Sequence, residues 1–107
     1  MPDSALDSLH YKDFAPHVNT KFQVQLNDNA TMEIELVSVE EKLSSPRQEQ
    51  FALTFRAPAD APPHQWLYHL QHEQLGSGRL FLVPIGRDED ALIYEAVFNR
   101  RLKVDQQ

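Results

Sequence analysis

The stretch that decides the fold is RLFLVPIGRDEDALIYEAVFN, residues 79–99. Two runs rich in β-branched and aromatic residues, 79–86 and 92–99, flank the charged segment 87–90. Such residues favour extended strands, and a short charged segment between two strands is suited to a turn. The stretch therefore predicts two consecutive strands joined as a hairpin.

Upstream of the hairpin, apolar and polar residues alternate with a period of two in several segments. This alternation is typical of a strand with one buried face. The predicted strands centre on Phe22, Val24 and Leu26, on Met32, Ile34 and Leu36, on Phe51, Leu53 and Phe55, and on Trp66, Tyr68 and Leu70. At Leu36 and Val37 the apolar phase slips by one residue, which indicates a β-bulge.

Polar, glycine-rich and proline-rich segments separate these strands. We expect an exposed, mobile loop at 40–50 and an extended crossing at 57–63, where prolines cannot donate ladder hydrogen bonds. The glycines of the segment 73–78 suit a turn. The result is an all-β fold with one short N-terminal helix: a six-stranded antiparallel meander that closes into a small barrel, which we favour, or into a two-layer sandwich.

The N-terminal part of the chain has a helical rather than an alternating pattern. Leu6, Leu9 and Phe14 recur at near-helical spacing, with Ser4 as a possible cap, so we expect a short helix around residues 4–15. A chain of 107 residues has room for one domain. We expect a helical lead-in over 1–19 and a single β-domain over 20–107.

Composition narrows the range of partners. The formal net charge of −6 argues against nucleic acid, because binding to phosphates requires an excess of Lys and Arg. The chain has no cysteine, so disulfides, thiolate nucleophiles and cysteine zinc sites are absent. The N-terminus is acidic, and no apolar run approaches the length of about 20 residues that spans a bilayer. We expect a bacterial cytoplasmic protein with no membrane partner.

Four segments resemble a small bacterial family of unknown function. They are QEQFALTFRAP (48–58), YHLQH (68–72), LFLVPIG (80–86) and YEAVFN (94–99). The family patterns that they resemble are Glu-x-Phe-Ser-Leu-x-Phe, Tyr-x-Leu-x-His, Leu-Phe-Leu-Val-Pro-x-Gly and Tyr-Glu-Ala-x-Phe-Asn. Together with Asp13 and Phe14, the resemblance spans residues 10 to 99.

The chain departs from the family pattern at three positions: Asn19 and Trp66, where members tend to have glycine, and Ala52, where they have serine. The resemblance brings no established activity with it. Members are sometimes encoded beside phage-tail-collar-like proteins, so the resemblance implies a role in assembly.

The last two predicted strands carry apolar residues on both faces. One face consists of Phe81, Val83, Ile85, Ile93 and Val97, and the other of Leu80, Leu82, Leu92, Tyr94, Ala96 and Phe98. Burial of both faces would require a cover, either the N-terminal helix or another subunit. We predict that the first set forms an interaction surface.

Glu95 lies inside an apolar strand, where a carboxylate needs a partner. The candidates for a structural ion pair are Arg56, Arg79 and Arg100. Alternatively, Glu95 and a neighbouring Glu33 or Glu35 could form a hydrolytic carboxylate pair. We favour the structural pair, because nothing else in the sequence builds a sugar site.

His64, His69 and His72 form the densest group of imidazoles. On a strand, His69 and His72 point to opposite faces, so they cannot easily converge on one metal ion. We therefore expect neither a metal site nor a cofactor, and we assign no catalytic residue.

The sequence favours a non-enzymatic β-domain that binds another protein or its own copies. A first alternative is a small barrel that binds an apolar ligand in its interior. The deciding feature is whether Phe51, Phe55, Trp66 and Tyr68 fill the centre or leave a cavity. A second alternative is a carboxylate-dependent hydrolase that uses Glu95.

Overall fold

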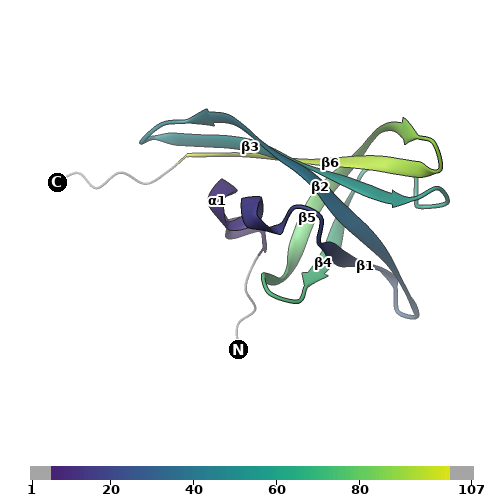
Figure 1. The fold of residues 1–107 in the computed structure, drawn as a ribbon. Coiled ribbons are helices and arrows are strands. Elements are labelled where there is room, and N and C mark those ends of the chain that lie inside the picture. Colours follow the sequence, from purple (N-terminus) through teal and green to yellow (C-terminus); the bar gives the residue numbers. More distant parts are fainter. Residues whose placement is uncertain (1–5, 102–107) are drawn as a thin grey trace.

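The structure is a computed structural model that describes residues 6–101. Three short helical turns precede six strands (Figure 1). The turns are η1 (Leu6–Ser8), α1 (Tyr11–Phe14) and η2 (Ala15–His17). The strands are β1 (Lys21–Asn27), β2 (Ala30–Ser44), β3 (Gln48–Pro58), β4 (Trp66–His72), β5 (Gly76–Asp88) and β6 (Ala91–Arg101).

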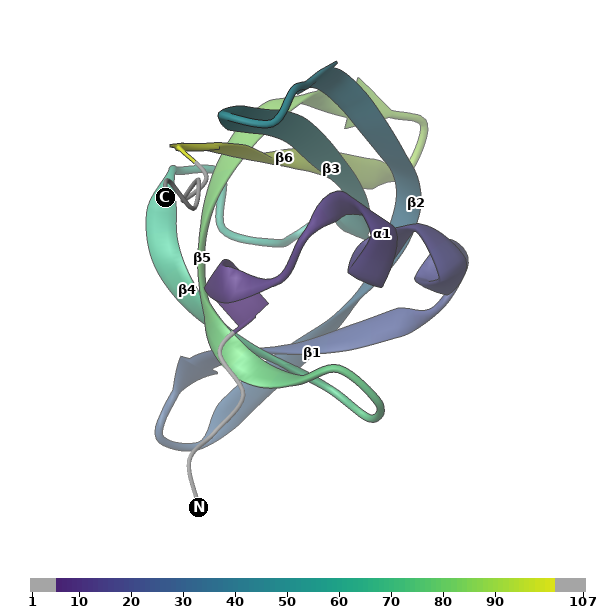
Figure 2. The ribbon, with the colours of Figure 1, turned by 90° about the vertical axis from the view of Figure 1, so that its left-hand side faces the viewer.

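The six antiparallel strands close into a ring of hydrogen-bonded neighbours, a barrel with the order β1-β2-β3-β6-β5-β4 (Figure 2). The predicted fold class is confirmed. The order departs from a plain meander at one place, because β3 pairs with β6 and β4 pairs with β1. Pro62 and Pro63 lie in the connection from β3 to β4, where they cannot donate ladder bonds, so the chain crosses over instead of forming a hairpin.

The segment 40–50, predicted as a mobile loop, is instead mostly strand. β2 and β3 pair from Glu35 opposite Arg56 to Ser44 opposite Glu49, and a tight turn at Ser45 joins them. This part of the hairpin is largely solvent-exposed, so its pairing needs no apolar alternation, which is why the sequence pattern missed it. The predicted bulge is confirmed by the register shift between Leu36 and Ser38.

The helix predicted around residues 4–15 is broken into single turns; its first two residues lie outside the described range. The break lies at His10, which is extended with a φ of −109°. The backbone N–H of His10 donates to Asp13 Oδ2 at 2.8 Å and so begins a new turn at Tyr11. Pro16 then stands at the start of η2.

Asn19 has a positive φ of 76° just before β1. Asparagine tolerates this left-handed conformation better than most residues, whereas glycine adopts it without steric cost.

One hydrophobic core fills the barrel and includes part of the segment before β1, residues 6–20, which we call the N-terminal segment. Leu6 and Phe14 from that segment are fully buried. Phe14 lies 6.0 Å from the ring of Phe51 and 5.6 Å from that of Phe98, and these last two rings stack at 4.5 Å. The N-terminal segment therefore closes one opening of the barrel, across which it runs in Figure 2.

Candidate functional site

The outward side chains of β5 and β6, which we call the outer face, are the first candidate site. The inward set Leu80, Leu82, Leu92, Tyr94, Ala96 and Phe98 is buried. On the outer face, Phe81 is 49% exposed, Ile85 53% and Val97 65%. Val83 and Ile93 are half-buried. The described part of the N-terminal segment therefore leaves much of this apolar face open to solvent.

A groove divides one half of the outer face. The first half of β5, residues 76–82, pairs with β4, and only the second half, residues 83–88, pairs with β6. β6 continues along β3 to its end. Because the two strands diverge, Phe81 and Val97 line a groove together with Leu67 of β4, which lies opposite Phe81.

Two charged residues of opposite sign flank Phe81 and Val97 on the outer face, and Arg101 lies further along the outward side of β6. Arg79 is exposed and shares its side of β5 with Phe81, whereas Glu95 is half-buried and shares its side of β6 with Val97. Among residues 6–101 neither one forms an ion pair.

The ion pair expected between Glu95 and an arginine is thus not found in the described chain. Arg56 pairs with Asp88 at 2.9 Å, and Arg100 lies 3.9 Å from Glu49. Arg56 is close to Glu95 along the β3–β6 ladder, but the residue directly opposite it is Ile93. Its guanidinium donates a hydrogen bond to Asp88 instead. Glu33 and Glu35 lie on β2, which is separated from β6 by β3, so the structure does not bring them beside Glu95.

The four aromatic residues that could have lined an interior ligand site differ in burial. Phe51 and Phe55 are fully buried and Tyr68 is nearly so, and all three belong to the packed core. Trp66 is instead 64% exposed and lines a surface groove with Leu26, Leu67 and Arg79. Phe51, Phe55 and Tyr68 thus fill the centre, Trp66 does not take part, and nothing in the placement of the four rings favours an interior ligand.

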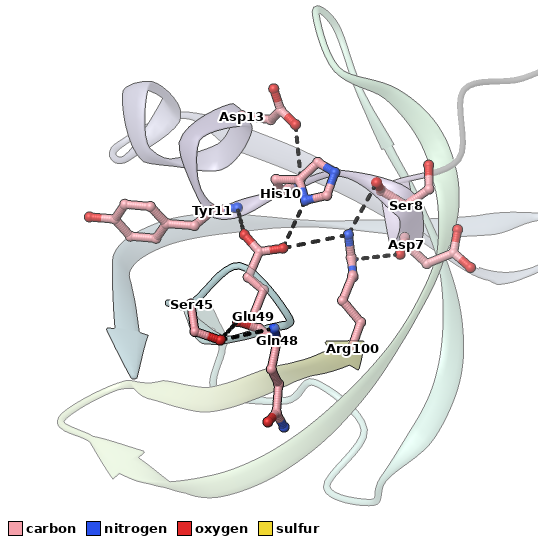
Figure 3. A network of polar contacts seen from close by, with 9 residues as sticks. All are labelled: Asp7, Ser8, His10, Tyr11, Asp13, Ser45, Gln48, Glu49 and Arg100. Carbon is pink, nitrogen blue, oxygen red and sulfur yellow. Dashed lines mark hydrogen bonds and ion pairs between the residues drawn. The ribbon is translucent and has the colours of Figure 1, made fainter. Parts of the chain in front are cut away.

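A polar network at the closed end of the barrel is the second candidate site, and the sequence did not predict it (Figure 3). Its centre is Glu49, a carboxylate that is only 8% exposed. His10 Nδ1 lies 2.8 Å from Glu49 Oε1, and the Tyr11 backbone N–H donates to Oε2 at 3.0 Å. Because an ionised carboxylate only accepts hydrogen bonds, Nδ1 of His10 carries the proton in this contact.

The network also binds Arg100 of β6. Its guanidinium donates to the backbone carbonyls of Asp7 at 2.9 Å and Ser8 at 3.2 Å. It also lies over the rings of Phe51 and Phe98. Glu49 and Arg100 together tie the N-terminal segment to the barrel from two neighbouring strands.

Opposing effects set the pKa of Glu49. Burial raises it, but the Tyr11 N–H, the hydrogen bond and charge of His10 and the charge of Arg100 lower it, and the net pKa is below its ordinary value. The carboxylate is therefore ionised at neutral pH. A carboxylate held in this state by its partners is a poor proton donor, so the network is suited to fixing the N-terminal segment rather than to acid catalysis.

His72 forms a further buried contact to the same segment. Its Nδ1 accepts from the backbone N–H groups of Gln74 at 3.0 Å and Leu75 at 3.1 Å. The ring proton is therefore on Nε2, which lies 2.9 Å from Thr20 Oγ1, and that hydroxyl donates to the His17 carbonyl. Burial, and secondarily the charge of nearby His17, lower the pKa of His72.

The other histidines of the predicted group lie apart from this contact. His64 and His69 are exposed, while His72 is 6% exposed. Within residues 6–101 no three His, Cys, Asp or Glu side chains are grouped so that they could hold a metal ion.

The fold and these sites define a small closed antiparallel barrel with a polar network at one end and an apolar outer face. The chain belongs to the family described as a domain of unknown function (DUF6916), which matches residues 9–98. This confirms the predicted uncharacterised domain family; the separate strand motifs and the phage-tail-collar neighbourhood stay predictions. Neither the curated proteins nor the solved structures gave a match.

Membrane insertion through a helix has no support in the described part of the chain. None of the helices within residues 6–101 is long and apolar enough to span a bilayer. The cytoplasmic location expected from the sequence stays a prediction.

Proposed function

We propose that this protein is a non-enzymatic interaction module that binds another protein chain through the outer face of β5 and β6. The observation that carries the proposal is the exposure of Phe81, Ile85 and Val97 on the outward side of two neighbouring strands, which also carries two half-buried apolar residues. Large contiguous apolar patches on soluble proteins commonly mark contact surfaces.

Burial of this face supplies a driving force for binding. Full burial of one Val, Ile or Phe side chain is favourable by about 1.5–3 kcal/mol relative to exposure. Three such side chains that are about half exposed can therefore contribute several kcal/mol to a complex, before the cost of association.

The resemblance to a family sometimes encoded beside phage-tail-collar-like proteins supports a role in assembly. An assembly protein needs a folded core that is independent of its contact surface. Here the core is complete without the outer face, because the inward residues of β5 and β6 are buried in the single chain. The outer face is therefore available for contact without unfolding.

Co-purification with a tagged chain tests the proposal. We expect Val97→Asp to abolish capture of a partner, whether another protein or an untagged copy, because a carboxylate would have to be buried in the contact. Leu43→Asp is the matched control, since Leu43 is 41% exposed but lies on the β2–β3 hairpin away from the outer face. Equal capture by all three chains would exclude the outer face as the contact surface.

A further inference from the structure

We propose that the partner of the outer face is a second copy of this chain, held in a two-fold dimer by reciprocal pairs between Arg79 of one copy and Glu95 of the other. This inference rests on the proposed function and specifies its partner. Its basis is the order in which charged and apolar residues stand on the two strands.

The outer face has charges of opposite sign on either side of an apolar centre. Around the groove, the outward residues are Arg79, Phe81 and Val83 along β5, and Glu95, Val97, Asn99 and Arg101 along β6. Because Val83 lies opposite Glu95, Phe81 and Val97 stand between the two charges. Arg79 is four residues from Val83, about 13 Å along an extended strand, so the two charges are too far apart to pair within one chain.

A two-fold axis turns this arrangement into a self-complementary one. In a symmetric dimer, if residue i contacts residue j of the partner, then j contacts i. The axis lies in the plane of the contact, midway between Arg79 and Glu95 and perpendicular to the line that joins them. It therefore places Arg79 of each copy opposite Glu95 of the other. The same axis runs over the groove between Phe81 and Val97, so the most exposed apolar residues come to the centre of the contact.

The charges of the face are free to form such pairs. Within residues 6–101 no ion pair engages Arg79 or Glu95, although Asp7 lines the same groove as Arg79. Glu95 is half-buried beside Val83 and Val97, where a carboxylate without a partner is costly. A guanidinium from a second copy would satisfy it.

The net charge of −6 does not prevent this association. At physiological ionic strength, charges further apart than about 8 Å are largely screened, whereas direct pairs covered by apolar side chains are screened much less. Salt therefore weakens the general repulsion between the two copies more than it weakens the contacts across the axis.

Charge exchange tests the proposal by sedimentation velocity on the full chain. We expect the wild type to dimerise, and Arg79→Glu and Glu95→Arg each to weaken dimerisation at least tenfold, because each variant places like charges opposite one another. An equimolar mixture of the two variants should form a mixed dimer, and the double variant should regain the dimer of the wild type. Arg47→Glu and Glu33→Arg are the controls, since these exposed residues lie off the outer face and change the net charge equally.

The outcomes separate this inference from the proposed function. A wild type that stays monomeric up to its solubility limit overturns the second copy as partner, and the Val97→Asp co-purification then decides the proposed function alone. If Val97→Asp dissociates the dimer but the charge variants leave it intact, the Arg79–Glu95 pairing is wrong, and the outer face remains the contact surface. A dimer that resists all three substitutions overturns both. Circular dichroism and thermal melting of each variant show that the loss is not caused by unfolding.

Discussion

At the scale of single residues, Glu49 is the buried charge on which the closed end of the barrel depends. Glu49→Gln keeps the size of the side chain but removes the charge that His10 and Arg100 face. Since hydrogen bonds to charged groups are worth about 1.5–3 kcal/mol, we expect the free energy of unfolding to fall by about 1–3 kcal/mol, measured by urea denaturation. The control Glu33→Gln, at an exposed position of β2, should change it by less than about 0.5 kcal/mol. Equal effects of the two substitutions would contradict a special role of Glu49.

His72 should make the stability of the protein depend on pH. Its pKa in the folded protein is below the ordinary value of 6.5, so the unfolded chain takes up a proton first as the pH falls. The stabilising contribution is full above pH 6.5 and is lost as the pH falls through the lower pKa of the folded state. We expect denaturation midpoints to decrease on acidification in this window. His72→Asn, which can still accept the two backbone N–H groups, should show a shallower decrease.

The exposed His69 provides the matched control on the same strand. His69→Asn should leave the pH dependence of the wild type unchanged, because His69 is exposed and has no buried contact to lose. Titration of Glu49 does not contribute to the pH dependence in this window, since its pKa lies below 4.5 and its stabilising contribution is lost only in stronger acid. If His72→Asn retained the full slope, another group would be responsible.

The sequence held a partial signal for these residues. Glu49 continues the inward phase of Phe51 and Leu53, Arg100 continues that of Phe98, and His72 continues that of Leu70. Extending each alternation by one step would have placed all three polar side chains inside the barrel. That they converge on the N-terminal segment could not be read from the pattern, because His10 and Glu49 are distant in sequence and meet only when the ring closes.

At the scale of elements, the N-terminal segment acts as a plug for one opening of the barrel. Phe14 is fully buried and contacts Phe51 and Phe98 at the opening of the barrel. Truncation of a buried Phe to Ala typically costs about 3–5 kcal/mol, and we expect Phe14→Ala to lower the free energy of unfolding by this amount. Lys12→Ala, at an exposed position of the same turn, should have little effect. Chemical denaturation of both variants measures the difference, and similar values would refute the plug.

The strands were more predictable than their lengths or their order. The cores of all six are marked by alternation or by β-branched residues, and the bulge after Leu36 follows from the slip in apolar phase. The exposed half of the β2–β3 hairpin carries no such mark, so the pattern read it as a loop. The pairing of β3 with β6 depends on contacts between distant segments, which local periodicity cannot report.

At the scale of the whole molecule, the ring is held by seams of unequal length. β3 and β6 pair along their full lengths, from Gln48 opposite Arg101 to Pro58 opposite Ala91. β1 and β4 pair only from Gln23 to Gln25. Because local opening requires breaking the hydrogen bonds and packing of one seam, the barrel should open first between β1 and β4.

Native-state hydrogen exchange checks this order. We expect the amides of β1 and β4 that bond across the short seam to exchange through partial openings of lower free energy than amides near Leu53 and Ala96, at the middle of the long seam. Amides of the long seam should exchange only through global unfolding, with a free energy equal to that from denaturation. Uniform exchange across both seams would show instead that the ring opens only as a whole.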